Sequence, residues 1–232
     1  LVVVCLLTGN GSPRIEESMK RIAVLVVALA GFAAILPSVS NAQITTALGI
    51  PCGLVPAGPD TGQRQCGSDI YNPNQQPVPV DTRSTVQSFD GVPIDVNVAF
   101  PSTGGDGPYP LVMMFHGYGG GKASFSDMQR WLNKGYAVLS QTNRGFHESC
   151  GTTAAKAADP DCLTKGFVRL DDTRYEVRDA QVFAGRLVDE GLVLPSKIAA
   201  TGGSYGGGMS MALAALKDRM MMAEALSALN LQ

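Results

Sequence analysis

Alternating apolar and polar residues mark the first predicted strand. Apolar residues stand at every second position from Val92 to Phe100, separated mainly by polar ones. A period of two predicts a half-buried strand. The Asp90-Gly91 pair just before it is a hairpin signal. We therefore expect a partner strand at about 83–89 and an antiparallel start to the domain.

Three later apolar segments are continuous, which is typical of strands covered on both faces. They lie at 110–115, 136–139 and 197–201. Apolar residues at helical spacing follow each of them, at about 125–132 (with Ser124 or Ser126 as N-cap), 171–190 (capped from 171–173) and 209–217. Strand and helix thus alternate, which predicts an α/β fold. The expected sheet has parallel strands after the antiparallel start and helices on both faces.

Composition and charge narrow the classes of function. The chain is 45% hydrophobic and 16% charged, so it can bury a core and is not a disordered protein. Eighteen basic residues stand against twenty acidic ones, a net charge of −2. Domains that bind nucleic acid are usually basic, so we expect no nucleic-acid partner.

The N-terminal segment has the pattern of a secretory signal. Met19-Lys-Arg is followed by an apolar run at 22–36 and by small residues at Ser40 and Ala42, which predicts a signal peptide over 19–42. Because a membrane span needs about 20 apolar residues, we expect cleavage and no stable membrane insertion; an uncleaved anchor is the alternative. The protein would then be exported, to the periplasm or outside the cell. The expected parts are an upstream extension (1–18), the signal peptide (19–42), a disulfide-stapled, loop-like lead-in (43–81) and a partial α/β domain (82–232).

Four cysteines follow the predicted cleavage site: Cys52, Cys66, Cys150 and Cys162. In an oxidising compartment they allow three pairings. Their spacing favours two local disulfides, Cys52–Cys66 and Cys150–Cys162. A metal site is not expected, because no Cys-x-x-Cys pair and no histidine stand at ligand spacing.

A Gly-x-Ser-x-Gly motif lies between the third continuous strand and the helix after it. Gly202 and Gly206 flank Ser204 at a point where a sharp turn would direct a serine hydroxyl out of the sheet. The backbone N–H of Tyr205, at the helix N-terminus, could then donate to a developing oxyanion. The alternative is a glycine-rich crossover with an incidental serine.

A second motif, His116-Gly-Tyr118-Gly, follows the first continuous strand and should open at the same edge of the sheet. In this arrangement the loop supplies the other oxyanion donor, either an N–H near Tyr118 or the Tyr118 hydroxyl. A phosphate-binding Walker loop is excluded, because Ala123 stands where Ser or Thr must follow Lys122.

Together these motifs resemble the α/β-hydrolase fold and, more closely, the X-prolyl dipeptidyl peptidase and cocaine-esterase family of acyl hydrolases. The resemblance covers roughly residues 82–217 and includes Arg144-Gly-x-x-x-Ser149-x-Gly151. It implies that Ser204 is the nucleophile and that Tyr118 and Tyr205 provide the oxyanion donors.

In this fold the catalytic residues run Ser, Asp, His along the chain, but no histidine follows Ser204. We therefore expect the domain to be C-terminally truncated, the triad Asp and His to lie beyond residue 232, and this chain to be inactive by itself. His116 is expected to hold the oxyanion loop by a hydrogen bond, and His147 is not expected to be the base.

The predicted function is an exported serine hydrolase that cleaves an ester or amide, of the X-Pro peptide or acyl ester class, through an acyl-enzyme. The partner is a small-molecule or peptide substrate, and neither a metal nor an organic cofactor is required. The alternative is a non-catalytic α/β-hydrolase-like binding or scaffold protein. The sequence does not indicate an oligomeric state.

Overall fold

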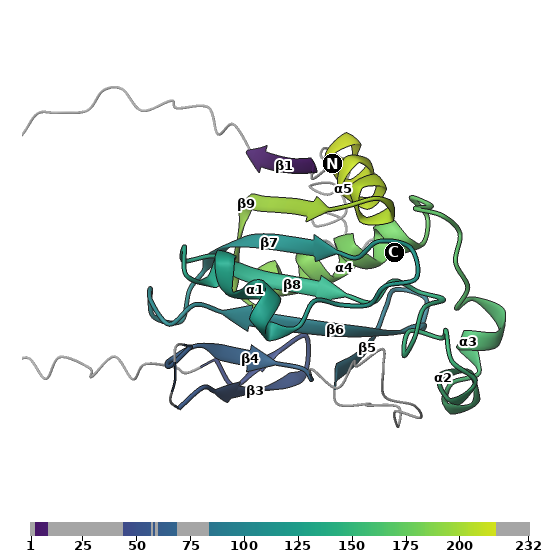
Figure 1. The fold of residues 1–232 in the computed structure, drawn as a ribbon, viewed down its shortest axis with the longest axis horizontal. Coiled ribbons are helices and arrows are strands. Elements are labelled where there is room, and N and C mark those ends of the chain that lie inside the picture. Colours follow the sequence, from purple (N-terminus) through teal and green to yellow (C-terminus); the bar gives the residue numbers. More distant parts are fainter. Residues whose placement is uncertain (1–2, 9–43, 57, 59, 69–83, 217–232) are drawn as a thin grey trace, which may run out of the picture.

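The computed structural model describes residues 3–8, 44–56, 58, 60–68 and 84–216 (Figure 1). The strands are β1 (Val3–Thr8), β2 (Thr46–Ala47), β3 (Ile50–Leu54), β4 (Arg64–Cys66), β5 (Thr85–Gln87), β6 (Pro93–Phe100), β7 (Tyr109–Phe115), β8 (Ala137–Gln141) and β9 (Val193–Gly202). The helices are α1 (Phe125–Leu132), α2 (Thr153–Ala158), α3 (Asp161–Thr164), α4 (Glu176–Asp189) and α5 (Tyr205–Ala215).

The strands form one mixed sheet in the order β1-β9-β7-β8-β6-β4-β3-β2, with β5 paired to β6 beside this path. β7 runs parallel to both β8 and β9, so that Met113 stands opposite Leu139 and Ala200. β6 runs antiparallel to β8, β4 and β5. An antiparallel start followed by parallel strands is the arrangement that the sequence predicts, and the α/β-hydrolase fold class is confirmed.

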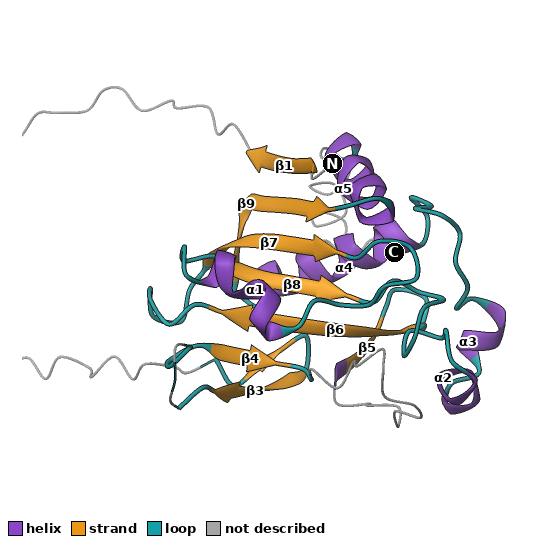
Figure 2. Cartoon of the chain, in the orientation of Figure 1, coloured by secondary structure: helices purple, strands orange, loops and turns teal. Residues whose placement is uncertain are grey.

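Helices cover both faces of the sheet (Figure 2). On one face, Met128 and Leu132 of α1 pack on Ala99 and Val138. The main core lies on the other face, where α4 and α5 meet the sheet. It includes Phe183 and Leu187 of α4, Met209 and Leu213 of α5, and Leu111, Met113 and Phe115 of β7. Because the parallel strands are covered on both faces, their sequences are continuous apolar runs.

β6 is more deeply buried than its alternating pattern predicts. Every residue from Ile94 to Phe100 is buried, including Asp95 and Asn97, so the prediction of a half-buried strand is wrong. β6 lies inside the sheet between β8 on one side and β4 and β5 on the other. Its polar side chains therefore face protein partners instead of water.

The lead-in is also more ordered than predicted. Residues 43–81 were expected to be loop-like, but β2, β3 and β4 lie within this range and extend the sheet. Cys52 and Cys66 stand directly opposite each other in the β3–β4 pair and form a disulfide. Strands of two to five residues are too short to show a hydrophobic period, which explains the miss.

Two helix starts differ from those expected. α4 begins at Glu176, without a side-chain cap, instead of at 171–173. Leu170 and Asp171 have positive φ, which is incompatible with a helix, and the Asp172 carboxylate binds the Arg174 guanidinium at 2.7 Å. α5 begins at Tyr205 instead of about 209, because three glycines join its first turn. At α1 the expected Ser124 cap is present, in a capping box with Asp127.

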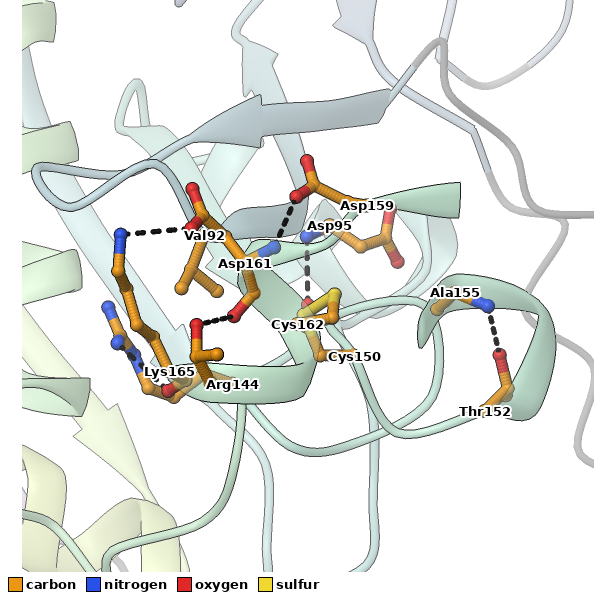
Figure 3. The surroundings of a disulfide bond; sticks show 12 residues. Val92, Asp95, Arg144, Cys150, Thr152, Ala155, Asp159, Asp161, Cys162 and Lys165 are labelled. Carbon is orange, nitrogen blue, oxygen red and sulfur yellow. Dashed lines mark hydrogen bonds and ion pairs between the residues drawn. A yellow bond between two sulfur atoms is a disulfide. The ribbon is translucent and has the colours of Figure 1, made fainter. Parts of the chain in front are cut away.

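The second expected disulfide, Cys150–Cys162, joins the segment after β8 to α3 (Figure 3). Lys165, which directly follows α3, forms an ion pair with Asp161 at the start of that helix, at 3.0 Å. In Figure 2, α2 and α3 lie beyond the edge of the sheet at which the parallel strands end. The disulfide therefore fixes a segment that borders this edge.

Arg144 is the largest fully buried side chain in the part of the chain that the structure describes. Its guanidinium donates to Asp179 of α4 at 2.8 Å and to Asp90 at 2.8 Å. Burial raises the pKa of Asp179 to about 6, against the opposing effect of Arg144. Three segments distant in the sequence are thus joined at one buried cation, next to the loop that follows β8.

The first residues of the chain also join the sheet. β1, which lies in the predicted upstream extension, pairs antiparallel with β9, from Val3 opposite Gly202 to Thr8 opposite Lys197. The predicted signal peptide, 19–42, lies outside the described residues. Among the helices that are described, none has the length and hydropathy needed to cross a membrane.

Candidate active site

Ser204 occupies the turn between β9 and α5. Its backbone has φ 53° and ψ −121°, a conformation that non-glycine residues rarely adopt and that costs about 1–3 kcal/mol. The residue is exposed, although Tyr205 directly after it is buried. Only Gly203 separates the end of β9 from Ser204, and α5 begins directly after the serine, so the serine protrudes from the carboxyl edge of the sheet.

Gly202 and Gly206 make this turn possible. A Cβ on Gly202 would lie 2.6 Å from the Gly206 carbonyl oxygen and 2.7 Å from that of Phe115. A Cβ on Gly206 would overlap the Phe115 oxygen and lie 2.9 Å from the His116 oxygen. The start of α5 therefore contacts the end of β7 backbone to backbone, and only glycine fits at these two positions.

The loop after β7 lies opposite Ser204. An ideal Cβ on Gly117 would be 3.9 Å from the Ser204 Cβ and 3.8 Å from the Gly203 oxygen, which is ordinary contact distance. The two motifs therefore meet at one edge of the sheet, as the parallel order of β7 and β9 requires. Both predicted oxyanion donors, at Tyr118 and Tyr205, are next in sequence to residues in this contact.

His116 holds this loop in place. The backbone N–H of Asn143 donates to His116 Nε2 at 2.9 Å, so the ring proton must be on Nδ1. Nδ1–H then donates to the Gly117 oxygen at 2.7 Å. Burial lowers the pKa of His116, which favours this neutral form. The expectation that His116 supports the loop by a hydrogen bond is confirmed.

His147 binds the far side of the same loop. Its Nε2 lies 3.0 Å from the Gly119 oxygen, and because a carbonyl only accepts, Nε2 is the donor. The residue has φ 41°, another strained position. The two histidines of the sequence thus each hold a carbonyl of the loop, at Gly117 and at Gly119.

Aromatic rings surround this edge. Tyr118 contacts Phe146 edge-to-face at 5.2 Å and Tyr205 at 6.1 Å, while Phe146 and Tyr205 are 5.8 Å apart. Phe146 and Tyr205 are buried, but the Tyr118 side chain is 66% exposed. Sequence reasoning missed Phe146, which carries no motif of its own and joins the site only through tertiary packing.

A small acidic group lies behind the turn. Asp171 packs against Gly208 in the first part of α5, where a Cβ would lie 3.1 Å from the Asp171 Cγ. Burial, together with the nearby Glu176 carboxylate, raises the pKa of Asp171 to about 6. Burial and the same two acids raise the pKa of the Tyr205 phenol, which therefore stays neutral.

The site residues offer no clear place for a metal ion. Within the described ranges, no group of three His, Cys, Asp or Glu side chains is arranged to hold one. The chemistry available at this edge is that of a hydroxyl, backbone N–H donors and two imidazoles.

Comparison with known proteins gives a family match. The family described as acetyl xylan esterase (AXE1) matches residues 81–228, more than half of the chain. This supports the coarser sequence prediction, an acyl hydrolase of the α/β-hydrolase fold. The finer resemblance to X-prolyl dipeptidyl peptidases and cocaine esterases remains a prediction.

The solved structures that are similar to the chain include two acetyl xylan esterases and a prolyl endopeptidase. Acetyl xylan esterase from Paenibacillus sp. R4 is 24% identical, with a TM-score of 0.46, over 73% of this chain and 50% of its own. Acetyl xylan esterase 1 from Thermoanaerobacterium sp. JW/SL YS485 is 25% identical, with a TM-score of 0.41, over 56% of this chain and 42% of its own. A prolyl endopeptidase, from a structural and mechanistic analysis of two such enzymes, is 26% identical, with a TM-score of 0.39, over 53% of this chain and 17% of its own. The chain thus spans half or less of the length of these structures.

Replacing the glycine at the β7 contact should destabilise the protein. We expect Gly206→Ala to lower the free energy of unfolding by about 2 kcal/mol or more, because its Cβ must displace backbone atoms of β7. Gly203→Ala is the matched control, since a Cβ there meets nothing within 4 Å, and its effect should be below about 0.5 kcal/mol. Chemical denaturation measures both, and equal effects would contradict the steric account of the turn.

Asp171→Asn should change the pH dependence of stability. The folded-state pKa of Asp171, about 6, lies above its value in the unfolded chain, so the wild type loses stability as pH rises from about 4 to 6. The variant lacks this loss and should gain on the order of 1 kcal/mol relative to wild type between pH 4 and 7, partial exposure screening the charge.

Asp172→Asn provides the comparison of opposite sign. Hydrogen bonds to Arg174 lower the pKa of Asp172 to about 2, so its contribution is present at neutral pH and is lost as pH falls from about 4 to 2. This variant should therefore be less stable than wild type at pH 7, where Asp171→Asn is more stable. Denaturation curves measured at pH 4 and at pH 7 give the change in stability with pH for each protein. If this change were the same for Asp171→Asn and for wild type, the assignment of Asp171 would be contradicted.

Proposed function

Because this chain belongs to the acetyl xylan esterase (AXE1) family, we propose that it is an exported serine hydrolase that cleaves an ester or amide through an acyl-enzyme at Ser204. The observation that carries the proposal is the exposed, strained Ser204 at the end of β9, in contact distance of Gly117. A strained backbone at an exposed serine has a cost to stability that a simple crossover between strand and helix would not require.

The first chemical step is attack by Ser204 Oγ on the substrate carbonyl carbon. The carbonyl oxygen becomes an oxyanion, and the Tyr205 N–H, in the first turn of α5, is positioned to donate to it. A general base takes the Oγ proton during the attack and returns it to the alcohol or amine, which leaves as the tetrahedral intermediate collapses to the acyl-serine ester. Water then hydrolyses this ester, which releases the acid and restores the serine hydroxyl.

The second donor is the Tyr118 N–H. The Gly117 oxygen accepts from both His116 Nδ1, at 2.7 Å, and the Gly120 N–H, at 2.9 Å. Because C=O and N–H of a trans peptide point in opposite directions, fixing this oxygen also fixes the direction of the Tyr118 N–H. The Tyr118 hydroxyl, on an exposed ring, is the other candidate donor from the same residue.

Acyl esters are the first substrate class under this proposal, because the matching family is described by an ester-cleaving activity. The resemblance in the sequence also implies X-Pro peptides as a second class. Export is supported by the signal-like segment at 19–42 and by two disulfides, which are rare in reducing compartments.

One observation favours a different function, a non-catalytic binding protein with the same fold. A serine hydroxyl needs a neighbouring base to become a nucleophile. The sequence has two histidines, and each binds a carbonyl of the 117–121 loop, at Gly117 or at Gly119. If no base reaches Ser204, the same edge could bind a carbonyl compound without cleaving it.

Labelling with a fluorophosphonate probe separates the two functions. The full-length protein is used, because this chain spans half or less of the solved structures it matches. We expect covalent labelling at Ser204, together with hydrolysis of 4-nitrophenyl acetate. Ser204→Ala should abolish the label and lower the esterase rate by about a thousandfold or more.

Ser196→Ala is the matched control, because Ser196 is also an exposed serine of the β9 region but lies far from its carboxyl end. It should label and hydrolyse like the wild type. A wild-type protein that takes no label at Ser204, or a Ser204→Ala variant that keeps its esterase rate, would favour the binding protein.

A further inference from the structure

Lys122, directly after the loop that faces Ser204, has an almost completely buried ammonium group. Its Nζ lies 2.7 Å from Asp95 Oδ1, and each of the two side chains is 3% exposed. Nζ also donates to the Val96 oxygen at 3.3 Å. Lysine is rarely buried unless paired, so this position has a specific partner in β6.

Asp95 is the centre of a hydrogen-bond network that joins the 117–121 loop to the segment at 142–149. Besides Lys122, its carboxylate accepts from the Ser84 hydroxyl at 2.6 Å and from the Thr142 hydroxyl at 3.3 Å. Its backbone N–H donates to the Ser149 hydroxyl at 2.9 Å, and that hydroxyl donates to the Thr142 oxygen at 2.6 Å. One carboxylate thus connects the segment at 142–149 with the end of the 117–121 loop.

Residues of β6, of β8 and directly after β8 also bind the backbone that follows the 117–121 loop. The Lys122 N–H donates to the Thr142 hydroxyl at 2.9 Å, and the Ala123 N–H donates to the Ser140 hydroxyl at 2.8 Å. The Ala123 oxygen accepts from the Asn97 amide at 3.1 Å. The loop between residues 117 and 121 is therefore fixed at its end by β6 and β8, as His116 fixes its beginning.

We propose that the Lys122–Asp95 ion pair positions the 117–121 loop, which supplies the second oxyanion donor. Lys122 and Asp95 are then positioning residues for the reaction at Ser204. This inference rests on the proposed function. Four of the five residues from 117 to 121 are glycine, so the loop has little intrinsic preference for one conformation. Its position depends on its two ends, and the ion pair is the charged contact at the second end.

Stability alone does not account for a buried pair of this kind. Removing one partner leaves an uncompensated charge and costs about 3–5 kcal/mol, but removing both charges is often neutral. What a neutral pair cannot reproduce is the direction of a short bond from Nζ to a fixed carboxylate. A misplacement of about 1 Å in a catalytic group can lower a rate about a hundredfold.

The test compares Lys122→Met, Asp95→Asn and the double variant in the full-length protein, with 4-nitrophenyl acetate as substrate. Both single variants should melt at lower temperature, and the double variant should recover most of the loss. The kcat of the double variant should still be about tenfold to a hundredfold below wild type, with KM within about twofold. Lys156→Met, an exposed lysine on α2, is the control and should leave stability and kcat unchanged.

Hydrogen exchange of the backbone amides at 118–121 gives a second readout that needs no activity. Exchange there should be faster in the double variant than in wild type, while exchange in β7 and β8 is unchanged. A double variant that recovers both melting temperature and kcat, or that changes only KM, would overturn the inference. Unchanged exchange at 118–121 would also overturn it. Because exchange does not require catalysis, this outcome can be read even if Ser204 proves not to be a nucleophile.

Discussion

The close approach of α5 to the end of β7 is the constraint on which the candidate site depends. Because Gly202 and Gly206 carry no side chain, the helix starts directly against the Phe115 and His116 carbonyls. The chain can make that approach only by a sharp turn, and Ser204 takes the strained conformation at its apex. An exposed hydroxyl, a helix N-terminus and the 117–121 loop thereby meet at one place.

Polar groups then give the flexible loop one position. His116 and His147 hold the carbonyls of Gly117 and Gly119, and the Lys122–Asp95 pair holds the residue that follows the loop. Arg144, in the segment after β8, likewise forms ion pairs with both Asp90 and Asp179 of α4. In each case a polar side chain links two segments of the chain, which a purely apolar core could not do.

The sequence predicted the parts of the site that depend on local chemistry. The Gly-x-Ser-x-Gly motif, the His116 motif, both disulfide pairings and the parallel strands all follow from residue type and spacing. It did not predict that Asp95 and Asn97 are buried, because the alternation of β6 looks the same whether its polar face meets water or Lys122. Phe146 and the Asp171 group were missed for a related reason, since their roles arise from contacts between segments far apart in the sequence.

The most direct test of the account is a crystal structure of the full-length protein after reaction with a phenylphosphonate ester, which mimics the tetrahedral intermediate. The account predicts phosphorus bonded to Ser204 Oγ and a phosphonyl oxygen about 3 Å from the backbone nitrogens of both Tyr118 and Tyr205. An adduct at another residue, or an oxygen that contacts no amide of the 117–121 loop, would contradict it.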